Sequence, residues 1–203
     1  MFTFLVAVSH LGNCNAPDAT WSLLRNTLVS LSAQTDSNFQ ILVVCGGMLD
    51  DFSDVDAIKN LKFLDVSDWG PLEKSTHLLK NLDKASKYMH GLHYLKETGY
   101  GEDDFVMTVD ADDFLSNKLV SYVKQNPITS NLWTLPSGYV FNSQRHRIGS
   151  LDCIAPRFDR RTFCGSSIIL RFKAYVRHML ASLSSSTTRE EFIVGMTKRK
   201  LFG

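Results

Sequence analysis

Three carboxylates crowd one short stretch of the chain. Asp110, Asp112 and Asp113 fill three of four consecutive positions, directly after the apolar run Phe105 to Val109. Carboxylates this close repel one another unless a cation neutralises them, and hard oxygen ligands suit Mg²⁺, Mn²⁺ or Ca²⁺. The same pattern also describes an acidic turn whose aspartates cap the following helix. Taken alone, this stretch supports a site and a turn about equally.

The composition is that of one ordinary globular domain. The chain of 203 residues is 44% apolar and 21% charged with a formal net charge of +1, so neither disorder nor a nucleic-acid partner is indicated. The four cysteines form no C-x-x-C pair, which argues against a zinc knuckle and indicates reduced thiols of a cytoplasmic protein. No apolar run approaches the roughly 18 residues that span a bilayer. We therefore expect a cytoplasmic protein without a transmembrane segment, in which any membrane contact is peripheral.

Alternating strands and helices are predicted to position the three acids. Apolar runs typical of buried parallel strands cover Thr3 to Ser9, Phe39 to Cys45, Leu61 to Val66 and Phe105 to Val109. Amphipathic helices are expected between them, at Trp21 to Leu31 and Leu78 to Leu92. This alternation predicts an α/β domain with a largely parallel sheet. In such sheets ligands bind at the carboxyl ends of the strands, which is where the acids lie.

The second half of the chain is less regular. A helix is expected over Ser116 to Gln125, strands over Leu132 to Phe141 and Ile168 to Phe172, and a helix over Lys173 to Leu183. Pro136 and Gly138 interrupt the first of these strands. Arg145 to Arg147 is expected to form a basic turn, and the aromatic residues Trp133 and Tyr139 are expected in the core rather than against a sugar ring.

In order, these segments resemble nucleotide-sugar glycosyltransferases of the GT-A fold, especially family 2. The resemblance covers roughly residues 3 to 172, and its parts are the first strand, TLVSLSAQTDSNFQILVV (Thr27 to Val44), a Lys-bearing helix leading into VDADDF, and FDRRTFCGSSIILR (Phe158 to Arg171). It implies a single GT-A, Rossmann-like domain: a mixed, mostly parallel sheet flanked by helices. Residues 1–115 would form its nucleotide-binding half, and residues 116–203 its acceptor-side half and tail.

The resemblance implies a metal-dependent hexosyltransferase-like enzyme. It would move a sugar from a nucleotide diphosphate donor, expected to be a UDP-sugar, to the hydroxyl of a carbohydrate or lipid-linked acceptor, with inversion. Carboxylates would hold Mn²⁺ or Mg²⁺ against the leaving diphosphate. Asp112 is the first candidate metal ligand, and Asp110 would contact the ribose or a metal-bound water. Asp113 would be an outer ligand or would lie on the N-cap side of the next helix.

The resemblance also places the donor at the ends of the first strands. The candidate donor contacts are Ser9, His10, Cys45, Gly46, Asp65, Lys84, Lys87, Asp110, Ala111, Gly165 and Ser166. Family members commonly carry an aspartate after the second strand to contact the base, whereas this chain has Cys45-Gly46-Gly47, so Asp65 or Asp68 is the alternative polar contact. From the residues alone, the glycines form a tight turn and the lysines a solvated helix face equally well.

Several residues could serve as the general base, and several function classes fit the sequence. Glu190, Glu191 and Asp152 are the base candidates, with Asp159 as a rival, and a solvated charge pair describes Glu190-Glu191 as well. The alternatives are a non-catalytic nucleotide- or carbohydrate-binding module, a nucleotidyltransferase on a related scaffold, and a peripheral membrane adaptor that uses the tail from Lys198 to Phe202. The stretch SHLGNCNAPD holds no basic residue to cradle a triphosphate, which argues against the nucleotidyltransferase.

Overall fold

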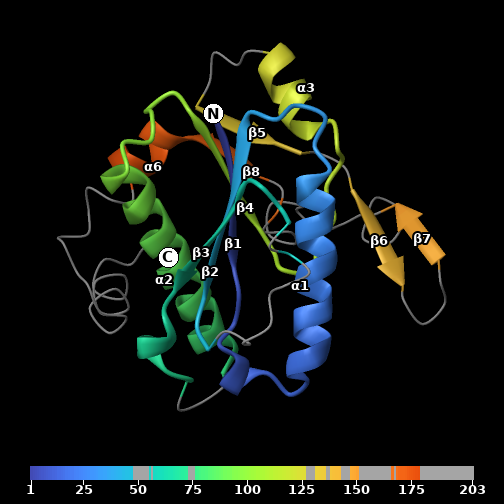
Figure 1. Ribbon diagram of the computed structural model, residues 1–203, viewed down its shortest axis with the longest axis vertical. Coiled ribbons are helices and arrows are strands. Elements are labelled where there is room, and N and C mark those ends of the chain that lie inside the picture. Colours follow the sequence, from blue (N-terminus) through green and yellow to red (C-terminus); the bar gives the residue numbers. More distant parts are fainter. Residues whose placement is uncertain are drawn as a thin grey trace.

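A mixed β-sheet lies between two layers of helices (Figure 1). The computed structural model describes residues 1–47, 55, 57–72, 76–126, 131–135, 138–142, 147–150, 166 and 168–178. The six strands of the sheet have the order β3-β2-β1-β4-β8-β5. In chain order they are β1 (Phe2–Ala7), β2 (Phe39–Cys45), β3 (Leu61–Asp65), β4 (Phe105–Val109), β5 (Leu132–Thr134) and β8 (Ile168–Arg171).

The strands β3, β2, β1 and β4 are parallel, as predicted. Ala7 pairs with Val44, Cys45 with Asp65, and Val6 with Val109, so these strands end along one edge of the sheet, the lower edge in Figure 1. The chain runs outward from β1 through β2 to β3 and then crosses to β4 on the other side of β1. The strand order therefore reverses between β1 and β4, which makes a topological switch point of the kind where α/β sheets bind ligands.

Helices cover both faces of the sheet. Helix α1 (Pro17–Ser32) packs on one face, and α2 (His77–Glu97) with α6 (Phe172–His178) packs on the other, while α3 (Leu119–Gln125) lies beside the amino ends of the strands (Figure 1). Two short 3₁₀ turns, η1 (Leu11–Asn13) and η2 (Ser67–Trp69), follow β1 and β3.

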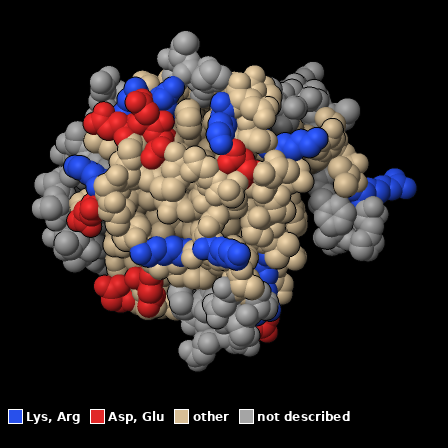
Figure 2. Space-filling model, turned by 45° about the horizontal axis from the view of Figure 1, so that its top comes forward, with Lys and Arg blue, Asp and Glu red and all other residues tan. Residues whose placement is uncertain are grey.

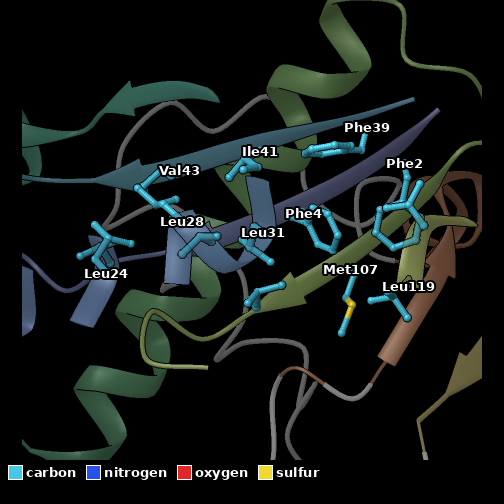
Figure 3. Packing of buried hydrophobic residues seen from close by; sticks show 14 of the residues in the cluster. Phe2, Phe4, Leu24, Leu28, Leu31, Phe39, Ile41, Val43, Met107 and Leu119 are labelled. Carbon is cyan, nitrogen blue, oxygen red and sulfur yellow. The ribbon is translucent and has the colours of Figure 1, made fainter. Parts of the chain in front are cut away.

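Side chains of β1 point alternately to the two faces of the sheet, so they belong to two hydrophobic cores, one under α1 and one under α2. On the α1 side, Leu24, Leu28 and Leu31 pack against Phe4 and Ile41 (Figure 3). On the α2 side, Leu5 meets Val44, Met89 and Leu92. Burial on both faces explains why β1 is nearly all apolar.

Three predictions for the second half are wrong. The stretch from Leu132 to Phe141 is not one strand: β5 joins the main sheet, whereas β6 (Tyr139–Asn142) pairs with β7 (Arg147–Ser150) in a separate two-stranded sheet. A proline between the two strands cannot donate a ladder hydrogen bond, which is consistent with the break. Strand β7 includes Arg147, which was expected in a basic turn. Tyr139 is 81% exposed rather than in the core.

Charges of both signs mix on the face of the molecule that Figure 2 shows. Figure 2, seen from the α3 side of the molecule, shows acidic and basic side chains next to one another at several places, in agreement with the near-zero net charge. Of the helices in the described ranges, none combines the length and the apolar character that a bilayer span requires.

Candidate functional site

Residues predicted from the sequence to contact a donor gather along the carboxyl edge of the sheet. Those that end or follow the parallel strands are Ser9, His10, Cys45, Gly46, Asp65, Asp110 and Ala111. Strand β8 runs antiparallel to β4, so Ser166, two residues before it, lies at the same edge. Gly165, Asp152, Glu190 and Glu191 lie outside the described residues, and their roles stay predictions.

Asp110 is held by three neighbours directly after β4. Its carboxylate forms an ion pair with Lys84 and accepts a hydrogen bond from the hydroxyl of Tyr88 at 3.4 Å. Its backbone N–H donates to Oγ of Ser166 at 2.8 Å. Burial, followed by the negative charge of Asp110, raises the pKa of Tyr88, so its hydroxyl stays protonated and donates. Helix α2 therefore fixes the first acid of the cluster.

Asp112 and Asp113 form the turn beyond it. The backbone N–H of Asp113 donates to the carbonyl of Asp110 at 3.2 Å. Asp112 forms no salt bridge within the described part of the chain, and desolvation followed by the charges of Asp113 and Asp110 raises its pKa. Asp113 does not cap the next helix, because α3 begins at Leu119 with Lys118 in the N-cap position and no capping side chain. The turn thus concentrates negative charge at the switch point.

Helix α1 braces the same turn from the other face of the sheet. Its polar side chains donate to backbone carbonyls of the acidic segment: Thr27 Oγ1 to Ala111 O (2.9 Å), Ser30 Oγ to Leu115 O (3.2 Å) and, from just beyond the helix, Gln34 Nε2 to Ser116 O (2.9 Å). Sequence reasoning did not identify these residues as part of the site. The available signal was their shared spacing on one side of an otherwise apolar helix face.

His10 and two glycines pack together at the ends of β1 and β2. A Cβ atom on Gly46 would lie 2.9 Å from His10 Cδ2, and one on Gly47 would lie 2.9 Å from His10 Cε1. Gly47 also has a φ of 66°, which L side chains rarely adopt, and its N–H donates to Ser67 Oγ at 2.9 Å. Nδ1 of His10 accepts from Gly12 N at 3.0 Å, so the neutral ring carries its proton on Nε2. The glycines are therefore needed to seat the His10 ring.

The side chain of Asp65 stabilises a turn, and that of Cys45 packs in the core. Asp65 Oδ1 accepts from Ser67 N at 2.9 Å, which closes the turn after β3. The Cys45 side chain is buried in the core, and burial raises the pKa of its thiol to about 12, so it is a neutral thiol near pH 7. A ligand would meet Cys45 through its backbone.

Lys84 and Lys87 have different surroundings, although the sequence offered the same two interpretations for both, a donor contact or a solvated helix face. Lys84 is partly exposed and reaches Asp110. Lys87 is only 1% exposed, and its Nζ donates to Val8 O at 2.7 Å and to Asp83 Oδ2 at 2.8 Å. The prediction of a solvated position is therefore wrong for Lys87.

The residues of the turn fit a divalent ion that is shared with a phosphate ligand. No three His, Cys, Asp or Glu side chains within the described ranges lie close enough to hold a metal ion by themselves. Mg²⁺ is commonly held in proteins by one or two carboxylates together with substrate phosphates. Asp112, whose pKa is raised by desolvation and then by its neighbouring acids, offers such a carboxylate, whereas Lys84 already pairs with Asp110.

Comparisons with known proteins give low-similarity structural matches. No family model and no curated protein matches the sequence. A TarS structure from S. aureus is 16% identical, with 97% of this chain and 54% of that chain covered and a TM-score of 0.42. The galactosyltransferase LgtC, in complex with donor and acceptor sugar analogs, is 15% identical, with 97% and 70% covered and a TM-score of 0.40. The apo-form glycosyltransferase GlyE of Streptococcus pneumoniae is 12% identical, with 98% and 39% covered and a TM-score of 0.41.

The chain spans 54% of this TarS chain and 34% of a second, longer TarS chain. Solved structures similar to this chain thus include glycosyltransferases. Similarity at TM-scores of this size does not define an activity.

Proposed function

We propose that this chain is a GT-A-like glycosyltransferase domain that uses Mn²⁺ or Mg²⁺ and transfers a sugar from a nucleoside diphosphate, with UDP as the expected carrier, to an acceptor hydroxyl with inversion. The observation that supports this most is the acidic turn at the β1–β4 switch point, which α1 and α2 brace from opposite faces of the sheet. A solvated capping turn would not need hydrogen bonds and an ion pair from both layers.

The acids of the turn and the lysine that pairs with Asp110 have separate roles in this proposal. Asp112 would hold the divalent ion, which when bound supplies positive charge to the leaving diphosphate. Asp110, oriented by Lys84 and Tyr88, would contact the ribose or a metal-bound water. Lys84 would exchange part of its pairing with Asp110 for a donor phosphate, since an ammonium is a good point-charge partner for phosphate. The acceptor side and its base would come from residues 116–203.

On the β2 side of the switch point, the nucleoside would lie over the ends of β1 and β2. The Nε2–H of His10 and the backbone of Gly46 and Gly47 are the polar groups at that position. Glycines let a ligand approach the backbone closely, in addition to making room for the His10 ring.

The test is binding of UDP in the presence of Mn²⁺ by calorimetry, followed by release of UDP from UDP-sugars. We expect Asp112→Asn to abolish metal-dependent UDP binding while leaving the melting temperature close to that of the parent, because Asp112 is exposed. Glu97→Gln is the matched control: it removes an exposed carboxylate from the last turn of α2, whose pair with His93 is worth little. Equal UDP binding by Asp112→Asn and the parent would refute the role of Asp112.

A further inference from the structure

Helix α2 carries a buried charge pair next to the end of β1. Lys87 is 1% and Asp83 4% exposed, and they lie one turn apart with Nζ to Oδ2 at 2.8 Å. Removing two charges from water is costly, and a well-packed apolar pair is often as stable or more stable. Packing alone therefore does not account for this pair.

Lys87 also binds the backbone of Val8, the residue directly after β1. The register of β1 with β2 ends at Ala7 and Val44, and the N–H of Val8 still donates to Val44 O at 3.0 Å. The carbonyl of Val8 instead accepts from Lys87 Nζ at 2.7 Å.

Lys87 thus fixes the point from which the His10 segment leaves the sheet. Ser9 and His10 follow Val8 directly, and the His10 ring sits against Gly46 and Gly47. A shift of Val8 would move that ring. Three residues earlier on the same helix, Lys84 holds Asp110 after β4.

We propose that Lys87, oriented by Asp83, is a positioning residue for donor binding: it anchors Val8 O and thereby sets the Ser9–His10 segment, without itself touching the donor. This inference rests on the proposed function for its donor and on the contacts above for its mechanism. Two of the lysines of α2 then hold the two sides of one site, Lys87 at β1 and Lys84 at β4.

The decisive comparison is between Lys87→Met and the double variant Asp83→Leu with Lys87→Met. We expect Lys87→Met alone to lower the melting temperature, because it leaves the Asp83 carboxylate buried without its cation. The double variant removes both charges and should regain most of the parent's melting temperature. In both variants the Val8 carbonyl has lost a charged donor, so we expect UDP with Mn²⁺ to bind at least about tenfold more weakly.

A second readout does not need a ligand. Amide hydrogen exchange in peptides spanning residues 8–13 should become faster in both variants, while exchange in α1 stays at the parent's rate in the double variant. Lys96→Met is the matched control, since Lys96 is an exposed lysine of the same helix. It should change neither UDP affinity nor exchange over residues 8–13.

The outcomes separate the two proposals. A double variant that binds UDP as the parent does, with unchanged exchange over residues 8–13, overturns the positioning role and leaves Lys87 a stabilising residue only. A parent that binds no nucleoside diphosphate overturns the proposed function and the donor part of this inference. Faster exchange over residues 8–13 would still support the anchoring of Val8 in that case.

Discussion

Two lysines close together on α2 differ in their burial and in the strand end that they contact. Lys84 and Lys87 are three positions apart, which turns them about 60° from each other around the helix axis. That rotation leaves the Lys84 side chain 36% exposed at the end of β4 and the Lys87 side chain 2% exposed at the end of β1. The sequence does not show which lysine is buried, because the long apolar stem of a lysine can lie along the protein while its ammonium reaches water or a buried partner. The position of each lysine relative to the sheet edge decides its burial.

Gly47 gives a test at this scale. Gly47→Ala adds a Cβ 2.9 Å from the His10 ring at a residue whose φ is 66°. We expect a loss of about 1–2 kcal/mol in the free energy of unfolding from the backbone alone, together with weaker UDP binding because His10 is displaced. Chemical denaturation and calorimetry measure the two effects.

Gly99→Ala is the matched control for that change. Gly99 has a φ of 78° at the end of α2, and nothing lies within 4 Å of the Cβ that the substitution would add. It should lose comparable stability but keep the parent's UDP affinity. If both variants bind UDP equally well, His10 does not contribute to the nucleoside site.

At the scale of elements, α1 and α2 act as braces on opposite faces of the sheet. The leucines of α1 bury its apolar face, while Thr27, Ser30 and the nearby Gln34 bond the backbone that carries the acids. Helix α2 contributes Lys84 and Tyr88 to Asp110. The acidic turn therefore has no regular secondary structure, but hydrogen bonds and an ion pair from both helices hold it in place.

Thr27→Val tests the brace from α1. The substitution keeps the shape of a fully buried side chain but leaves the Ala111 carbonyl without the hydroxyl that donates to it. We expect a loss of about 1–3 kcal/mol in the free energy of unfolding and weaker binding of Mn²⁺ with UDP. Thr20→Val is the control, because its hydroxyl donates to the carbonyl of Ala16 at the N-cap of α1 and not to the acidic turn. Equal effects of both substitutions on binding would show that the brace does not act on the site.

Much of this arrangement is predictable from the sequence. Apolar runs of strand length that alternate with amphipathic helices predict β1 to β4 and their common edge, and the acids after β4 follow from that placement. The hairpin of β6 and β7 was missed because Tyr139 to Phe141 continues the apolar pattern that begins at Leu132, whereas Arg147–Ser150 has no run of apolar residues. The bonds from Thr27 and Lys87 to backbone carbonyls were missed because any polar side chain can make them, and only the packed fold selects the partner.

For the whole molecule, the two edges of the parallel sheet differ in charge pairing. At the amino edge, the N-terminus pairs with Asp104, and Asp103 pairs with Arg171 and Lys173. At the carboxyl edge, the turn from Asp110 to Asp113 carries three carboxylates, and Lys84 pairs with the first of them. Excess negative charge at a switch point favours a cation, and a cation there favours a phosphate ligand.

That asymmetry predicts how ligands change the stability of the whole protein. A ligand that binds only the native state at about 100 times its dissociation constant stabilises by about 2.7 kcal/mol, which for a domain of this size raises the melting temperature by roughly 5–10 °C. We expect this shift with Mn²⁺ and a nucleoside diphosphate together, and a smaller one with either alone, because the ion and the diphosphate share the site. A thermal-shift screen across the four common bases, with Asp112→Asn as the control, measures it. Selective stabilisation by UDP would identify the base, whereas shifts that are independent of Mn²⁺, or equal in Asp112→Asn, would contradict a metal-bridged donor site.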